Sequence, residues 1–391
     1  MSISKLKLNY LPELKTILFG RKRPTMVSVN LTSKCNQSCV YCEINKTSSI
    51  IRDSEQLDKD DLFWIIDQMA LIGIKRLSLC GGEPFLFNDI IDVVAYASEK
   101  TIVCNISSNG MVLCEKTLEE LAILKKCQTH VNISIDSFND DIQSKVRGNR
   151  SALKNALCAI KVLQRHHIPY TVLTAISNFN FSDLSHSFIE AKKIGVKEII
   201  YQPIIYASNY PEKNPIDEKG KINVSLENLA EMQAQLKTIA KYEKRSALKT
   251  NTYRLKPWIN EYIKSSCLKV EKPFYKKVLK KFHCREVYAV IDIDYYGGIQ
   301  PCGLLKAEVN IKNHNNENLL SLWNLATKNL KENLYTGDFP EVCDSCCHKF
   351  SRNMLSSIMK YPLVNSKTLV IIFILLSKRI ANQFIKTIFI K

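Results

Sequence analysis

Short apolar runs alternate with segments of helical spacing through the first 245 residues, and this alternation limits the fold more than any other feature. The predicted strands are 27–31, 76–80, 102–107, 131–136, 170–176 and 198–203. The predicted helices are 58–71, 89–99, 115–126, 151–166, 182–193 and 223–243. Strands that alternate with helices form parallel βαβ units. The sequence therefore predicts an α/β fold, a partial (β/α)6 TIM-like barrel over 25–245, with its active face at the carboxyl ends of the strands.

Three cysteines follow the first predicted strand at the spacing C-x3-C-x2-C: Cys35, Cys39 and Cys42. Three thiolates can bind three irons of a cubane and leave the fourth iron open, whereas four cysteines close a cluster and suit electron transfer. A zinc site or three buried thiols is the alternative interpretation. Zinc usually needs a fourth Cys or His nearby, and residues 43–51 contain neither.

The cysteine pattern, with Tyr41 directly before the last cysteine, resembles that of the radical S-adenosylmethionine (SAM) enzymes. The resemblance implies a 4Fe–4S cluster on Cys35, Cys39 and Cys42 whose open iron binds the amino and carboxylate groups of SAM. It implies that one electron from the cluster cleaves SAM to methionine and a 5′-deoxyadenosyl radical. By family position, Tyr41 lies beside the adenine.

Gly81-Gly82-Glu83-Pro84 closes the second predicted strand. Two glycines let a backbone approach a ligand closely, and a carboxylate can accept a hydrogen bond from an ammonium group. An ordinary turn is the alternative. The resemblance implies that Gly81, Gly82 and Glu83 hold the amino group of the methionine part of SAM.

Polar residues follow the next two predicted strands in the same way. The resemblance implies that Asn109 lies near the ribose of SAM and the substrate. Ser134 and Asp136 resemble a family Ser-x-Asp segment, whose serine contacts the ribose or the methionine carboxylate. Arg147, in the next predicted loop, is expected to pair with that carboxylate through its guanidinium fork. The alternatives are an Asn-Gly turn for Asn109 and a surface salt bridge for Arg147.

A second cysteine set lies beyond the barrel, within 246–355. The set consists of Cys284, Cys302, Cys343 and Cys346. A predicted hairpin over 291–301, with its turn near 296–298, brings Cys284 and Cys302 towards each other. The four cysteines alone allow zinc or 4Fe–4S. The spacing is similar to the opening of SPASM and Twitch domains, which implies a shorter, Twitch-like auxiliary domain with one 4Fe–4S cluster, and Cys347 or His348 as alternative ligands.

The net charge of +17 is concentrated in basic stretches, including a lead-in over 1–24 and a tail over 356–391. The tail combines an apolar run, shorter than the roughly 20 residues of a spanning helix, with interleaved basic residues. It predicts an interfacial helix on an anionic membrane, with docking on the protein itself as the alternative. No secretory signal is visible, which favours a location in the cytoplasm or at the inner face of the membrane. In that reducing environment we expect most of the single cysteines to be inert thiols. No nucleic-acid-binding motif accompanies the basic runs, so nucleic acid is disfavoured.

The sequence thus predicts an enzyme that abstracts hydrogen from a substrate, with the auxiliary cluster accepting the electron or binding the substrate. Net oxidation or crosslinking of a small molecule, peptide or lipid-linked substrate is expected, with flavodoxin or ferredoxin as a one-electron donor. No peptide-binding domain is recognisable at the N-terminus, which disfavours ribosomal-peptide maturation. The catalytic acid or base is not identified. The alternative is a non-catalytic protein that binds zinc and nucleic acid or a membrane.

Two cubanes held by cysteine predict about eight irons per chain after anaerobic purification. Removing Cys284 and Cys302 together is expected to leave about four irons, because only the barrel cluster would remain. Iron and sulfide analysis measures this. A count of about four that the double variant does not change would contradict the auxiliary cluster.

Overall fold

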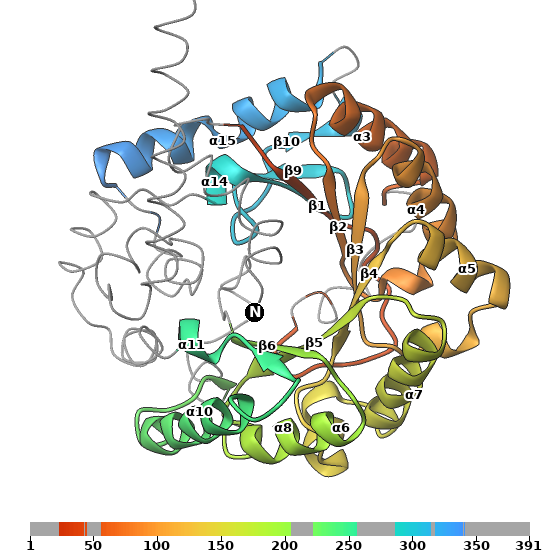
Figure 1. Cartoon of the computed structure of the whole chain (residues 1–391). Helices are drawn as coiled ribbons and strands as arrows, with labels where there is room; N and C mark the ends of the chain where they lie inside the picture. Colours follow the sequence, from red (N-terminus) through yellow and green to blue (C-terminus); the bar gives the residue numbers. More distant parts are fainter. Residues whose placement is uncertain are drawn as a thin grey trace, which may run out of the picture.

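The computed structural model describes residues 23–42, 44, 56–204, 222–255, 286–313, 317–338 and 340 (Figure 1). Predictions for Cys284, Cys343, Cys346 and the tail 356–391 lie outside the described residues, as does almost all of the lead-in. Among the helices that are described, none combines the length and apolar content needed to cross a bilayer.

Six consecutive strands pair side by side in parallel, which confirms the predicted partial barrel. The strands are β1 (Met26–Asn30), β2 (Arg76–Cys80), β3 (Val103–Ser108), β4 (His130–Ser134), β5 (Tyr170–Ile176) and β6 (Glu198–Pro203). A short strand, β7 (Lys249–Thr250), pairs with β6. The strand order is β10-β9-β8-β1-β2-β3-β4-β5-β6-β7. Since β10 and β7 are the two edge strands and do not pair with each other, the sheet is open.

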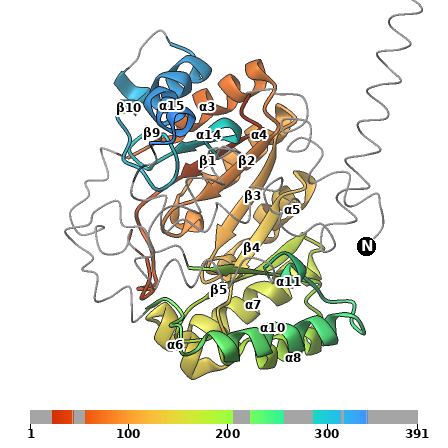
Figure 2. The ribbon, with the colours of Figure 1, turned by 90° about the vertical axis from the view of Figure 1, so that its left-hand side faces the viewer.

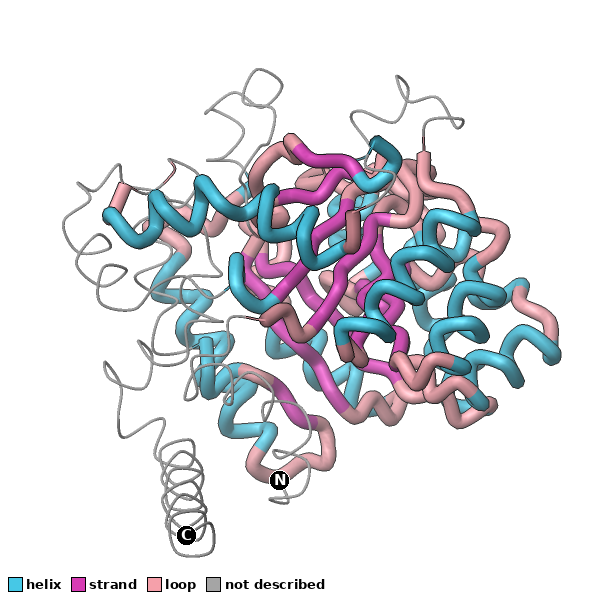
Figure 3. The backbone as a smooth tube through the Cα atoms, turned by 90° about the horizontal axis from the view of Figure 1, so that it is seen from above, coloured by secondary structure: helices cyan, strands magenta, loops and turns pink. Residues whose placement is uncertain are grey.

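Helices form a layer outside these strands (Figures 1 and 3). They are α3 (Lys59–Ile72), α4 (Ile90–Glu99), α5 (Leu118–Lys126), α6 (Asp140–Arg147), α7 (Ala152–Arg165), α8 (Leu184–Lys193) and α10 (Leu229–Glu243). Shorter helical segments are η3 (Pro84–Leu86), η4 (Leu113–Glu115) and α11 (Thr252–Leu255). The predicted helices are present, apart from shifts at their ends.

The alternation of side chains along β1 shows why the layers form. Val27 and Val29 are fully buried in one core cluster with Ile66 and Met69 of α3. Successive side chains of a strand point to opposite faces, so Ser28 lies on the inner face of the partial barrel. The same apolar-out, polar-in pattern recurs in β2 and β3. Apolar burial against the helices therefore fixes which side chains face inward.

Helix α6 was not predicted. Asn139 caps its first turn by accepting hydrogen bonds from the backbone N–H groups of Asp141 and Ile142. Gly148 ends it with φ +61°. The prediction that Arg147 lies in a loop is therefore wrong: Arg147 is the last residue of α6 and is buried.

The described part of the C-terminal region continues the barrel sheet. Strand β8 (Val290–Ile293) pairs in parallel with β1, and β9 (Gly298–Gln300) returns antiparallel to β8, which confirms the predicted hairpin. The remaining elements here are α14 (Glu286–Ala289), β10 (Val309–Asn310), η6 (Ile311–Asn313) and α15 (Leu319–Thr336). Helix α15 lies beside β9, β10 and α3 in both ribbon views (Figures 1 and 2). The domain boundary predicted at 245/246 stays a prediction.

Cys114 and Cys158 form a disulfide between η4 and α7, with Cα atoms 6.1 Å apart. The expectation that most of the single cysteines are inert thiols therefore does not extend to this pair. The turn after β3 lies directly on α7, where a Cβ on Gly110 would come within 2.9 Å of the Ala159 side chain. This close approach brings the two cysteines together across 44 residues of sequence.

We expect Trp323→Ala to lower the free energy of unfolding by about 3–5 kcal/mol, because a large aromatic side chain leaves a cavity when truncated in a core. Trp323 of α15 is 1% exposed, and its Nε1 donates to the carbonyl oxygen of Val290 in β8. Leu325→Ala, on the same helix but at a side chain 52% exposed, is the control and should change little. Urea unfolding measures both. Equal decreases in the free energy of unfolding for the two variants would show that α15 is not anchored on β8.

Candidate functional site

The cysteine loop, residues 31–42, is fixed on one side by the turn after β2. The N–H of Gly82 donates to the carbonyl oxygen of Thr32 at 2.7 Å, and the N–H of Glu83 donates to that of Lys34 at 2.7 Å. A Cβ on Gly82 would overlap with the carbonyl oxygen of Lys34. Gly82 therefore permits a backbone-to-backbone approach that no other residue allows. The glycine pair that the sequence singled out contacts the cysteine loop directly.

The end of α6 fixes the loop on its other side. Ser38 and Val40 donate through their N–H groups to the carbonyl oxygens of Arg147 and Val146, at 3.1 and 3.0 Å. A Cβ on Gly148 would overlap with the carbonyl oxygen of Ser38. The cysteine loop is thus held between two glycine-lined backbones, and its three cysteines, all half-buried, occupy a defined place.

Glu83 joins the ends of β2 and β3. Its side chain is fully buried and accepts hydrogen bonds from the Ser108 hydroxyl at 2.8 Å and the backbone N–H groups of Asn109 and Phe85, at 2.8 and 3.2 Å. Burial raises the pKa of Glu83, and these hydrogen bonds oppose the shift. A carboxylate has about four acceptor positions, so these bonds leave room for a ligand N–H. Its predicted contact with the amino group of SAM stays a prediction.

Asn109 reaches from the end of β3 to the first cysteine. Its Nδ2 donates to Oδ1 of Asn36 at 2.7 Å and lies 3.9 Å from Sγ of Cys35. Its own Oδ1 accepts from the N–H of Met111 at 2.9 Å. The Asn-Gly turn and a role at the site are therefore compatible, because the turn directs the amide at the cysteine loop.

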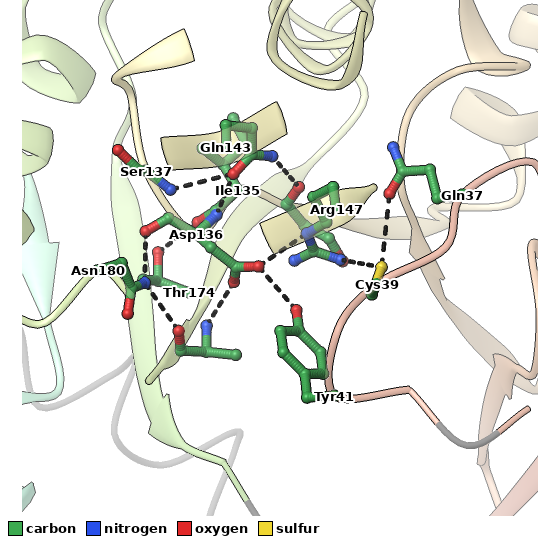
Figure 4. Close-up of polar contacts among 12 residues, drawn as sticks. Gln37, Cys39, Tyr41, Ile135, Asp136, Ser137, Gln143, Arg147, Thr174 and Asn180 are labelled. Carbon is green, nitrogen blue, oxygen red and sulfur yellow. Dashed lines mark hydrogen bonds and ion pairs between the residues drawn. The ribbon is translucent and has the colours of Figure 1, made fainter. Parts of the chain in front are cut away.

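The half-buried Tyr41 and the buried pair Asp136 and Arg147 form a network beside Cys39 (Figure 4). Oδ2 of Asp136 accepts from the Tyr41 hydroxyl at 2.7 Å and lies 2.8 Å from Nε of Arg147. Nη1 of Arg147 lies 3.8 Å from Sγ of Cys39, and its guanidinium lies 5.7 Å from the centre of the Tyr41 ring. The alternative of a surface salt bridge for Arg147 is wrong, because the ion pair is buried and belongs to the cysteine loop.

The ionisation of these groups reflects burial and the guanidinium charge. Burial raises the pKa of Cys39 to about 11, although the positive charge of Arg147 opposes the shift. Burial likewise raises the pKa of Cys35 and, strongly, that of Tyr41. Burial disfavours the charged form of Arg147, but the Asp136 carboxylate outweighs it and raises the pKa of Arg147. A thiolate at Cys39 therefore needs a further stabilising interaction, such as a bound metal, besides the charge of Arg147.

The donor set fits an iron–sulfur cluster. Three thiols extend from one loop, and N–H groups of Asn109 and Arg147 lie beside two of them. Among the described residues, no three His, Cys, Asp or Glu side chains gather around one point as ligands of a single ion would. The thiolates of a cubane each bind a different iron and so need not converge on one point. Cys35, Cys39 and Cys42 are the residues that would hold it.

Two more of the predicted residues, Ser134 and Cys302, lie in different parts of the structure. Ser134 ends β4 and shares the inner face with Leu173, its partner in β5. Cys302 lies after β9, which runs opposite to β1, so it lies at the other end of the sheet from the cysteine loop. There it packs with Leu330 and Val287. Of the predicted auxiliary ligands, only Cys302 is among the described residues.

Two further features of the structure were not foreseen. A cavity of about 380 Å³ lies beside Cys302, away from the cysteine loop, and is lined in part by Pro301, Leu305 and Leu330 of α15. In addition, the inner face of the sheet is polar: Ser28, Ser78 and Asn105 lie side by side on β1, β2 and β3. Oδ1 of Asn105 is buried with no hydrogen-bond partner among the described residues. The period-two alternation of these strands is the sequence signal that could have revealed this face.

Residues 29–188 match the family model of the Radical SAM superfamily. An AdoMet-dependent heme synthase from Methanosarcina barkeri is 29% identical over 172 residues, which cover 44% of this chain and 48% of that protein. A PqqA peptide cyclase from Bradyrhizobium diazoefficiens is 27% identical over 161 residues, 41% of each protein. The chain therefore spans less than half the length of these two curated relatives.

A solved structure shows the same fold. The crystal structure of Streptococcus suis SuiB bound to the precursor peptide SuiA matches with a TM-score of 0.58 and 15% sequence identity. The match covers 85% of this chain and 72% of SuiB. At this identity the likeness concerns the fold alone, and it extends over the barrel and beyond it.

We expect Gly148→Ala to destabilise the cysteine loop more than Gly73→Ala destabilises its own helix end. Both glycines end a helix with positive φ, +61° and +78°, so each alanine costs about 1–2 kcal/mol of backbone strain. Only the methyl group at position 148 overlaps with the loop, which adds about 1–3 kcal/mol. Urea midpoints and bound iron measure the difference. Equal effects of the two substitutions would contradict a loop held by this contact.

Proposed function

Because this chain belongs to the radical SAM superfamily through residues 29–188, we propose that it is an enzyme that binds a 4Fe–4S cluster and SAM at the barrel mouth. The observation that carries the proposal is the cysteine loop itself, fixed between Gly82 and Gly148 with N–H donors beside two of its thiols. Members of the superfamily bind SAM and a 4Fe–4S cluster. When bound, these groups supply one-electron cleavage of SAM to an organic radical.

The residues of the chain would then position and enclose the cofactor. Cys35, Cys39 and Cys42 hold the cluster, and Glu83, buried at the end of β2, offers its remaining acceptor positions to the amino group of SAM. The other proposed contacts with SAM are Tyr41, Gly81, Gly82, Asn109, Ser134, Asp136 and Arg147. They come from the carboxyl ends of successive strands, or from elements just after them, where the ligand sites of such barrels lie.

We further propose a peptide as the substrate class. One relative is a PqqA peptide cyclase, and the fold resembles that of SuiB, which was solved with a precursor peptide. The polar inner face supports the same choice, because Ser28, Ser78 and Asn105 offer hydroxyl and amide groups that can pair with peptide N–H and C=O groups. A one-electron donor such as flavodoxin or ferredoxin completes the reaction.

The auxiliary 4Fe–4S cluster on Cys284, Cys302, Cys343 and Cys346 remains part of the proposal. Cys302 lies at the amino ends of the parallel strands, where it packs with Leu330 and Val287. In this proposal a cluster there accepts an electron from the substrate or binds it. The described cavity beside Pro301 and Leu330 adjoins this position.

We expect the anaerobically reconstituted protein to form 5′-deoxyadenosine from SAM in the presence of a strong reductant. Cys35→Ala should reduce this to background, because the cluster loses one of its three ligands. Cys127→Ala, at a half-buried free thiol outside the site, is the matched control and should retain the reaction. Chromatography of the nucleoside products measures it. A Cys35→Ala variant that cleaves SAM as well as the wild type would contradict the proposal.

A further inference from the structure

Arg147 occupies a position between a carboxylate and a cluster ligand. Its Nε lies 2.8 Å from Oδ2 of Asp136, and its Nη1 lies 3.8 Å from Sγ of Cys39. Its side chain is 9% exposed, and that of Asp136 is fully buried. A guanidinium is always protonated in proteins. A permanent positive charge is thus buried beside one of the three thiols of the loop.

The surroundings fix that charge in place. Oδ1 of Asp136 accepts from the N–H of Ala175 at 2.9 Å, and its Oδ2 also accepts from the Tyr41 hydroxyl. The backbone around Asp136 is bound as well, because its N–H donates to Oε1 of Gln143 and its carbonyl accepts from Nδ2 of Asn180. The carboxylate has no freedom to turn away from Arg147. The guanidinium therefore keeps one orientation toward Cys39 (Figure 4).

The two opposite charges do not cancel at the sulfur. Arg147 contacts Cys39 directly, whereas Asp136 lies behind the guanidinium as seen from Sγ (Figure 4). Charges interact more strongly in a buried, low-dielectric site than in water. The net field at Cys39 is therefore positive.

We propose that Arg147, held by Asp136 and Tyr41, is a positioning residue that raises the reduction potential of the barrel cluster through its contact with Cys39. Hydrogen bonds and charges at the sulfur ligands are among the factors that set cluster potentials. Reduction moves one electron from the donor to the cluster, and the donor is oxidised by one electron. The reduced cluster is more negative by one charge, so a nearby guanidinium stabilises it. This inference rests on the proposed cluster at Cys35, Cys39 and Cys42.

The proposal differs from the expectation that Arg147 serves only the carboxylate of SAM. A residue that acts only on SAM would leave the potential of the SAM-free cluster unchanged. A residue that acts on Cys39 changes that potential before SAM is added. Redox titration of the full chain without SAM therefore separates the two roles.

The experiment compares the wild type with Arg147→Gln, Arg147→Lys and Arg150→Gln by anaerobic titration followed by electron paramagnetic resonance. At a fixed solution potential, Arg147→Gln should lower the ratio of reduced to oxidised barrel cluster about tenfold, equivalent to about 59 mV for one electron. Arg147→Lys should fall between the two, because it keeps the charge and loses the fork. Arg150→Gln removes the same charge at an exposed position three residues away and should match the wild type.

Tyr41→Phe keeps the experiment decisive if Arg147→Gln fails to hold iron. It removes one hydrogen bond to Asp136 and should shift the ratio in the same direction by a smaller factor. An unchanged ratio in the Arg147 or Tyr41 variants, with weakened SAM binding only, would overturn the inference. A wild-type protein that holds no cubane at the barrel would instead overturn the proposed function.

Discussion

The structure depends on the close packing of the cysteine loop between two backbones. Gly82 and Gly148 lie so near to the loop that a Cβ at either position would overlap with a carbonyl oxygen. Hydrogen bonds from Glu83 on one side, and to the end of α6 on the other, complete the contact. Since the sheet and α6 hold the loop at both edges, its thiols have their positions before any ligand binds.

Hydrogen bonds also hold the side chains around the loop in place. Glu83 links the ends of β2 and β3, while Asp136 links the end of β4 to Arg147 and Tyr41. Both carboxylates are buried and accept hydrogen bonds from donors within the chain. A site built in this way places charge and hydrogen-bond donors before a cofactor arrives, which limits reorganisation during the reaction.

The barrel could be predicted from the sequence because its signals are local. The expected bounds of β2, β5 and β6 agree with those observed, since apolar period and turn residues mark strands within a few positions. Helix α6 was missed because it has only eight residues and only two of them, Ile142 and Val146, are apolar, which is too short a pattern to mark a helix. The contact between Tyr41 and Asp136 spans 95 residues, and nothing in either segment indicates it. The sequence around a cysteine does not distinguish a free thiol from a disulfide partner 44 residues away, so the pairing of Cys114 with Cys158 could not be predicted.

The central claim is that the cysteine loop holds a cluster with one iron open to SAM. The most direct measurement is electron paramagnetic resonance of the reduced protein lacking Cys284 and Cys302, recorded with and without SAM. The account predicts a single cubane signal whose g values change when SAM is added, because SAM would bind the iron that no cysteine holds. A cubane signal that SAM leaves unchanged, or no cubane signal at all, would contradict it.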